Sequence, residues 1–400
     1  MQRDLVVVNH PALSVWNFGT ALAPRNAPQD GVLALVGLVA PASWVVRLIV
    51  VGCLIWGLVY VWRAIPVLVP RVAAMVLVAW NPFVAERLAQ GHWALVCTWW
   101  LLPVVMGTGR WSMVAQWLAS LTPTGACAAA VASRRWGFGL VVSLPWLIPS
   151  LIMRPVASAS EAFAPRRNVW DILGLGGIWN SAVTPGSRLS AWSLAAGVGM
   201  AVCVAVILAS RPRHHRWALV CALLGLVVAL ITAFVPLGWV YSHVPGAGLL
   251  RDGSKWLVLV SPALVAACRT LESLPWGRIG AAVLTVLALA SVPDLPSHLR
   301  VLAPVAEDPG WYSARGPAPM IVTIGGHVAL NPVFKAADVA PEGPLRVGGT
   351  PADPAVIPPV SSSWEQPWRW WLGLGLSVQF LMCGAQAAVA SGHRCAPTRR

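Results

Sequence analysis

Charged residues are scarce in this 400-residue chain. They make up 10% of it, whereas a soluble domain carries about 25%. Hydrophobic residues make up 57%, and the mean hydropathy is +0.69. Intrinsic disorder requires low hydrophobicity, and the 35 glycines and 34 prolines lack the period of three that collagen needs. The composition therefore predicts an integral membrane protein with several spans.

Lysine is almost absent, since only Lys255 and Lys335 occur and every other basic residue is arginine. The formal net charge is nevertheless +14. A nucleic-acid-binding protein gathers its basic residues on one soluble face, whereas these arginines lie between apolar runs. We therefore expect no nucleic-acid partner.

Several catalytic and metal-binding patterns are also missing. None of the eight cysteines forms the CxxC spacing of a zinc or thiol-redox site. HExxH, a Walker loop and a nucleophile elbow do not occur. The sequence therefore contains no recognisable metal-binding motif.

Apolar runs predict about nine transmembrane helices, because a helix needs about 20 apolar residues to cross the hydrocarbon core. The clear candidates are 42–64, 191–209, 217–234 and 368–388. The shorter or interrupted candidates are 66–80, 91–106, 137–153, 254–268 and 279–292. The predicted fold class is thus an all-α integral membrane protein with irregular extracytoplasmic loops.

Arginines in short loops predict the orientation, because positive charge is retained on the cytoplasmic side. If Arg110 and Arg134 are both cytoplasmic, residues 112–132 cannot form a full membrane crossing. Pro123 and Gly125 in that stretch suit a re-entrant hairpin of two half-helices. With this hairpin the C-terminus is cytoplasmic, and every acid except Glu272 falls outside.

The predicted organisation alternates membrane and outer segments. It comprises an outer loop with a short helix at 1–41; a helical bundle at 42–292 with outer loops at 81–90, 154–190 and 235–253; a Pro/Gly-rich extracytoplasmic segment at 293–367; a final span at 368–388; and a basic cytoplasmic tail at 389–400. Within the long outer segment, 320–324 and 327–333 form a possible strand pair. Nothing before residue 41 resembles a signal or a first span, so either the N-terminus crosses unaided or an upstream helix is missing.

The segment from Asn81 to Trp93 has the marks of a short interfacial helix. Asn81 suits the N-cap, and Gly91 suits the C-terminal stop. We expect Glu86, Arg87 and His92 to be displayed at the outer membrane surface, where they would contact substrate. The alternative is an ion pair that fixes the helix geometry.

A second polar segment lies just outside the 254–268 span. Arg251 and Lys255 suit a lipid phosphate, which an arginine fork can hold with paired hydrogen bonds. Ordinary snorkelling at the interface is the alternative. Asp252 would bind a metal, orient Arg251 or pair with it.

The glycine-rich stretch from Asp171 to Asn180 superficially resembles a nucleotide-binding loop. It lacks the strand-turn-helix context that such a loop needs, so we reject nucleotide binding there.

Three separated motifs carry a resemblance over about residues 2 to 292. They are Asn81-Pro-Phe-Val with Glu86-Arg87 and Gly91-His-Trp93, Gly176-Gly-Ile-Trp-Asn180, and Gly248-Leu-Leu-Arg-Asp-Gly-Ser-Lys-Trp256. They resemble a group of actinobacterial polytopic membrane proteins. That group is similar to the C-type glycosyltransferase superfamily, which takes sugars from polyprenyl-phosphate donors at the outer membrane face.

The resemblance implies an acidic residue just after the first span, acting as general base or as ligand of a divalent metal. Asp4 is the position that looks like it. The resemblance also assigns Arg251 and Lys255 to the donor phosphate, and Glu86, Arg87 and His92 to donor or acceptor contacts. Implied partners are membrane lipids, a polyprenyl-phosphate sugar and an envelope glycan or lipid acceptor, in the inner (plasma) membrane.

Two other function classes stay open. A transporter or flippase for a lipid-linked envelope precursor would place functional polar residues at mid-membrane, between two related repeats. A noncatalytic partner in envelope assembly would tolerate loss of individual site residues.

Overall fold

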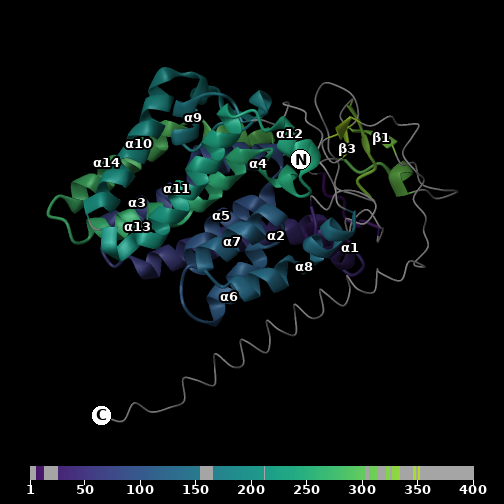
Figure 1. Ribbon diagram of the computed structural model, residues 1–400, viewed down its shortest axis with the longest axis horizontal. Helices are drawn as coiled ribbons and strands as arrows, with labels where there is room; N and C mark the ends of the chain where they lie inside the picture. The colour runs from purple at the N-terminus through teal and green to yellow at the C-terminus, as the bar shows by residue number, and fades with distance from the viewer. Residues whose placement is uncertain are drawn as a thin grey trace, which may run out of the picture.

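The computed structural model describes residues 6–12, 26–153, 165–210, 212–301, 306–312, 321–324, 327–333, 346–347 and 350–351. Helices dominate these segments (Figure 1). Six of them are long and apolar enough to cross a membrane: Ala42–Ala64, Leu68–Gln90, Ala191–Ser210, His215–Phe234, Gly253–Leu271 and Gly277–His298. Trp93–Val105 and Trp136–Leu151 are shorter apolar helices. The chain is therefore helical in its bulk, with the character of a multi-pass membrane protein.

The α-helices are α1 (Gln29–Val36), α2 (Ala42–Ala64), α3 (Leu68–Ala79), α4 (Pro82–Gln90), α5 (Trp93–Val105), α6 (Arg110–Ala119), α7 (Pro123–Ser133), α8 (Trp136–Met153), α9 (Val169–Leu173), α10 (Ala191–Ser210), α11 (Pro212–Phe234), α12 (Gly238–His243), α13 (Ser261–Leu271), α14 (Gly277–Ser291) and α15 (Leu295–His298). The 3₁₀ helices are η2 (Ser181–Val183), η3 (Gly186–Leu189), η4 (Ala247–Leu250), η5 (Gly253–Val260), η6 (Leu299–Val301) and η7 (Pro309–Tyr312). The predicted final span at 368–388 lies outside the described residues.

The helices form two packed groups. In one, α3 lies against α13 and α14, and α10 against α14; in the other, α5 lies against α2, α6 and α7, and α7 against α8 (Figure 1). The strands lie at one edge of the molecule. As the sequence predicts, β1 (Ile321–Ile324) and β2 (His327–Leu330) pair antiparallel, with Ile321 opposite Leu330. A second small pair joins β3 (Arg346–Val347) to β4 (Thr350–Pro351).

The surface of α2 suits a lipid environment. Leu48 and Ile55 are more than half exposed, and Trp44 and Trp62 are exposed near its two ends. These tryptophans are 18 residues apart, about 27 Å at 1.5 Å per residue, close to the ~30 Å hydrocarbon core. Tryptophan is enriched at both membrane interfaces. The outward apolar face of α2 therefore matches one bilayer thickness.

Hydrogen bonds between helices show which residues lie together at each end of the bundle. At one end, Glu272 Oε1 accepts from Val67 N at 2.8 Å, and Arg71 Nε donates to Ile65 O at 2.7 Å. At the other, Trp80 Nε1 donates to Val292 O at 3.0 Å. We call the first the arginine end, which carries Arg71, Arg110, Arg134, Arg135 and Glu272. The second is the acidic end, which carries Glu86, Asp171, Asp252 and Asp294.

Helices α6 and α7 form a hairpin at the predicted position. Its tip meets the middle of the bundle, because Thr98 Oγ1 on α5 donates to Ala119 O at 2.8 Å. Its base lies at the C-terminal end of α5, where Arg135 Nη2 donates to Gly107 O at 2.5 Å and to Ser112 Oγ at 2.6 Å. Both ends of the hairpin thus lie at the arginine end. With 10 and 11 residues, each helix is about 15 Å long, half the thickness of the hydrocarbon core.

Residues 6–12 are held between α2 and the chain around Glu307 and Val333. Asn9 N donates to Glu307 Oε1 at 2.7 Å, and Ala12 N donates to Val333 O at 2.6 Å. Ser43 Oγ, at the start of α2, donates to Asn9 Oδ1 at 2.5 Å. The chain next to the N-terminus is therefore fixed at the N-terminal end of α2.

The turn of the hairpin generates a stability prediction. A Cβ at Gly125 would overlap Ala119 O and lie 2.6 Å from Thr98 Oγ1. Gly125→Ala would therefore push the start of α7 away from the end of α6. We expect a loss of about 1–3 kcal/mol. Gly52→Ala is the matched control, because Gly52 is also helical and a Cβ there has no neighbouring atom within 4 Å. Thermal denaturation in detergent measures both, and equal melting temperatures for the two variants would contradict the close packing.

Candidate functional site

Helix α4 forms as the sequence predicts. Asn81 Oδ1 accepts from Val84 N at 3.0 Å, Pro82 occupies the first turn, and Gly91 ends the helix at φ +96°. Glycine suits that left-handed conformation because it lacks a Cβ. The local signals therefore set both ends of the helix.

The expectation that Glu86 and Arg87 are displayed at the membrane surface is wrong. All nine residues of α4 are buried, with Glu86 2% and Arg87 1% exposed, while His92 is half-buried. The physical reason is that the 165–190 and 247–256 segments bond to the polar side chains of α4 from two sides. Arg87 instead matches the alternative, an ion pair that fixes the helix, since it pairs with Asp252.

The Arg87 cluster consists of Arg87, His92, Asp252, Ser254 and Lys255. Arg87 Nη1 donates to Asp252 Oδ2 at 2.6 Å, and Arg87 Nη2 donates to Asp252 Oδ1 at 3.0 Å. Nη2 also donates to Ser254 Oγ at 2.6 Å, and Nη1 lies 3.1 Å from His92 Nδ1. This fork-to-fork pairing, charge-assisted on both sides, is the strongest common geometry for an arginine and a carboxylate.

The electrostatics favour ionised Asp252. Burial alone would raise its pKa, but Arg87 and Lys255 outweigh burial and hold the pKa well below its usual range. Lys255 Nζ lies 3.6 Å from Asp252 Oδ2, and its side chain is 21% exposed. One carboxylate therefore faces two fixed cations, and Arg251 precedes it in the chain with 8% exposure. The local charge is positive.

The structure shows three partners of Asp252. Its described bonds go to Arg87, Ser254 and Lys255. Both terminal nitrogens of the Arg87 guanidinium are bonded to Asp252, and Arg87 is buried, whereas Lys255 and His92 are only half-buried. Lys255 is thus better placed than Arg87 to meet a ligand.

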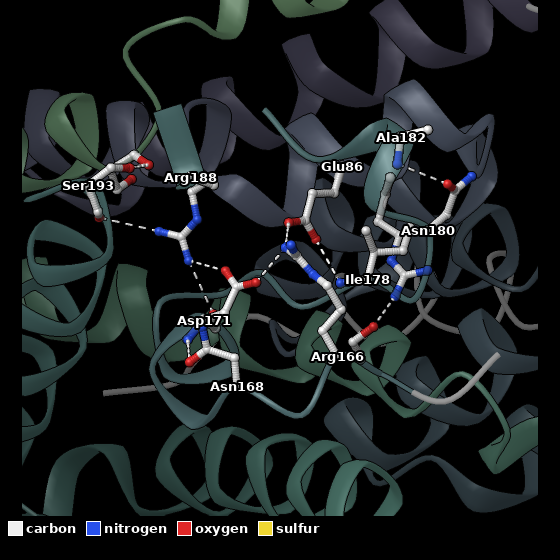
Figure 2. Close-up of polar contacts among 12 residues, drawn as sticks. Glu86, Arg166, Asn168, Asp171, Ile178, Asn180, Ala182, Arg188 and Ser193 are labelled. Carbon is white, nitrogen blue, oxygen red and sulfur yellow. Dashed lines mark hydrogen bonds and ion pairs between the residues drawn. The ribbon is translucent and has the colours of Figure 1, made fainter. Parts of the chain in front are cut away.

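The Glu86 cluster consists of Glu86, Arg166, Asp171 and Arg188 (Figure 2). Asp171 lies between two arginines, with Arg188 Nη2 at 2.5 Å from Oδ1 and Arg166 Nη2 at 2.6 Å from Oδ2. Arg166 Nη2 is also 3.8 Å from Glu86 Oε1. Arg188 is fully buried, whereas the side chain of Arg166 is 26% exposed. Two acids and two arginines balance in charge.

The glycines of the 171–180 stretch make room for these charged groups. A Cβ on Gly176 would lie 2.5 Å from Asp171 Oδ1 and 3.0 Å from Glu86 Oε1, so those oxygens are at most 5.5 Å apart. A Cβ on Gly174 would lie 2.9 Å from Arg188 Nη2. The stretch is glycine-rich because carboxylate and guanidinium groups occupy the space of side chains.

Glu86 and Gln90 lie four residues apart on one face of α4, and both hold the same segment. Ile178 N donates to Glu86 Oε2 at 3.0 Å, and Asn180 Nδ2 donates to Gln90 Oε1 at 2.9 Å. The second oxygen, Oε1, accepts no hydrogen bond from the part of the chain that the structure describes. Glu86 thus keeps one buried acceptor beside Arg166.

Three residues of the Glu86 cluster were not among the sequence candidates: Arg166, Asp171 and Arg188. The available signal was an acid three residues before the first glycine of a glycine-rich stretch, with Asn168 ahead of it as the N-cap of α9. Arg188 lacked any comparable sequence signal.

The implied divalent metal does not fit the described residues. No group of three His, Cys, Asp or Glu side chains gathers among them, and arginines already hold the carboxylates of both clusters. Asp4, the expected base, lies outside the described residues.

No family model, curated protein or solved structure matches this chain. The site therefore rests on its geometry.

Removing one partner of the Arg87–Asp252 pair should cost more stability than removing both. Arg87→Met leaves a buried carboxylate whose main partner is gone, and we expect a loss of about 3–5 kcal/mol. Arg87→Met combined with Asp252→Leu removes the uncompensated charge, so part of this loss should be recovered. Thermal denaturation measures the series, with exposed Arg47→Gln as the control. A double variant less stable than Arg87→Met would refute the pairing.

Proposed function

We propose that the chain is a membrane glycosyltransferase that transfers a sugar from a polyprenyl-phosphate donor to a cell-envelope glycan or lipid. The observation that carries this proposal is the excess of positive charge around Lys255, Arg251 and Arg87, beside a buried carboxylate cluster at the same end of the bundle. A polyprenyl phosphate presents its phosphate at the boundary of the hydrocarbon core. Cations fixed near that boundary suit it.

The proposed topology has nine crossings and a re-entrant hairpin, with the acidic end outside and the C-terminus in the cytoplasm of a plasma membrane protein. The alternating direction of the helices supports it, because the Val67–Glu272 bond joins residues assigned to the inside and the Trp80–Val292 bond joins residues assigned to the outside. Arg135 holding Gly107 supports a hairpin that enters and leaves on the arginine side.

In the proposed reaction, Asp4 takes the proton of the acceptor hydroxyl. The hydroxyl oxygen then attacks the anomeric carbon, and the bond from that carbon to the phosphate oxygen breaks. The electron pair leaves with the polyprenyl phosphate, whose charge Lys255 and Arg251 stabilise. Arg87 acts as a positioning residue, because it orients Asp252 and thereby Lys255. Glu86 and His92 fix the neighbouring loop and the edge of the cation site.

A transporter of a lipid-linked precursor is the second candidate. The inner face of α6 favours it, since Ser112, Gln116 and Ser120 are buried at helical spacing inside the proposed membrane region. Gln116 Nε2 has no hydrogen-bond partner in the described segments. Transfer of labelled precursor across liposomes, abolished by Gln116→Leu, would favour transport over group transfer.

Reconstituted protein tests the enzyme. With polyprenyl-phosphate pentose or hexose donors and envelope glycan acceptors, we expect sugar transfer that Asp4→Asn abolishes. Lys255→Gln should raise the KM for the donor by about tenfold to a hundredfold, because a hydrogen bond to a charged group is worth about 1.5–3 kcal/mol. Arg278→Gln, an exposed arginine at the opposite end, is the control.

Two results would reject the proposal: no product with any donor, or product that survives Asp4→Asn. A harmful deletion in cells whose Asp4 and Arg251 variants grow normally would instead indicate the noncatalytic role.

A further inference from the structure

The base of the hairpin carries exposed positive charge that the proposed reaction does not use. Arg110 is the first residue of α6, and Arg134 is the C-cap of α7; both are exposed. These helices are neighbours, so the two arginine side chains start from adjacent helices at the base of the hairpin. For neither arginine is an ion pair found within the described segments.

Exposed tryptophans accompany these arginines. Trp111 is 61% and Trp136 is 58% exposed, one following Arg110 and the other opening α8. The Arg110 guanidinium carbon lies 5.3 Å from the centroid of the Trp111 ring. Trp111 also contacts Trp56 of α2 edge-on at 6.1 Å. Amphipathic rings in this position mark the level of lipid headgroups.

The backbone beneath this surface is rigidly held. Arg135 donates to Val105 O, Gly107 O and Ser112 Oγ, so its guanidinium is committed to joining α5 to the hairpin. Trp217 Nε1 of α11 donates to Ala132 O at 3.0 Å, and the Arg134 guanidinium lies 5.3 Å from the Trp217 ring. Arg110 and Arg134 are therefore presented from a fixed frame.

We propose that the base of the hairpin is a binding site for the headgroup of an anionic phospholipid. Arg110 and Arg134 hold the phosphate, and Trp111 and Trp136 pack at the level of the glycerol and upper acyl chain. The N-terminus of α6 adds its positive dipole end to the same surface. Basic surfaces between membrane helices on the cytoplasmic side recognise anionic headgroups in this way. The site lies at the opposite end from the proposed reaction and does not depend on it.

Lipid binding to the purified full chain tests the proposal. Delipidated protein in detergent is titrated with phosphatidylglycerol or phosphatidylcholine, and retained lipid is counted by native mass spectrometry. We expect phosphatidylglycerol to be retained preferentially. Each basic residue near an anionic membrane contributes about fivefold in affinity, so Arg110→Gln with Arg134→Gln should weaken binding about thirtyfold.

Matched variants separate the site from net charge. Arg47→Gln with Arg278→Gln removes the same charge from exposed positions elsewhere and should leave retention unchanged. Arg110→Lys with Arg134→Lys should restore most binding. Unchanged melting temperatures without lipid show that the variants fold.

Three results would overturn the proposal. These are equal retention of both lipids by the wild-type protein, equal weakening by the site and control pairs, and displacement of phosphatidylglycerol by inorganic phosphate at equal concentration. The last would assign the arginines to a free anion.

Discussion

The buried ion pair between Arg87 and Asp252 joins parts of the chain that lie far apart in sequence. Burying two charges is costly, and only close geometry with further hydrogen bonds offsets that cost. Here the pair has both, since Ser254 and His92 complete the donors and acceptors around the fork. Because this pair fixes α4 against the start of η5, the positions of Lys255 and Arg251 depend on it.

Next to this pair, Glu86 ties α4 to the 165–190 segment. Adjacent residues of one short helix thus hold two loops, one through a guanidinium and one through a carboxylate. The two clusters differ in charge: the Glu86 cluster is balanced, whereas the Arg87 cluster is positive. This difference in formal charge is why the proposed anionic ligand is assigned to the Arg87 cluster rather than to the Glu86 cluster.

The hairpin gives the molecule a second organising feature. Both of its ends lie at the arginine end, and its tip contacts the middle of α5, whose N-terminus adjoins His92. A single apolar helix thus connects the exposed arginines at one end with the charged clusters at the other. This arrangement separates the proposed lipid-binding site from the chemistry proposed at the acidic end.

The sequence by itself determined the helical membrane character, the limits of α2, α4 and α10, the break between α6 and α7, and the β1–β2 pair. These depend on local composition, on caps such as Asn81 and on breakers such as Pro123, which act within a few residues. Only the tertiary structure decided that Glu86 and Arg87 are buried, that Asp252 bonds to Arg87, and that Arg166 and Arg188 hold Asp171. Burial and pairing of a charge depend on segments that lie 165 residues away and more, and no local spacing encodes which distant segment covers a helix.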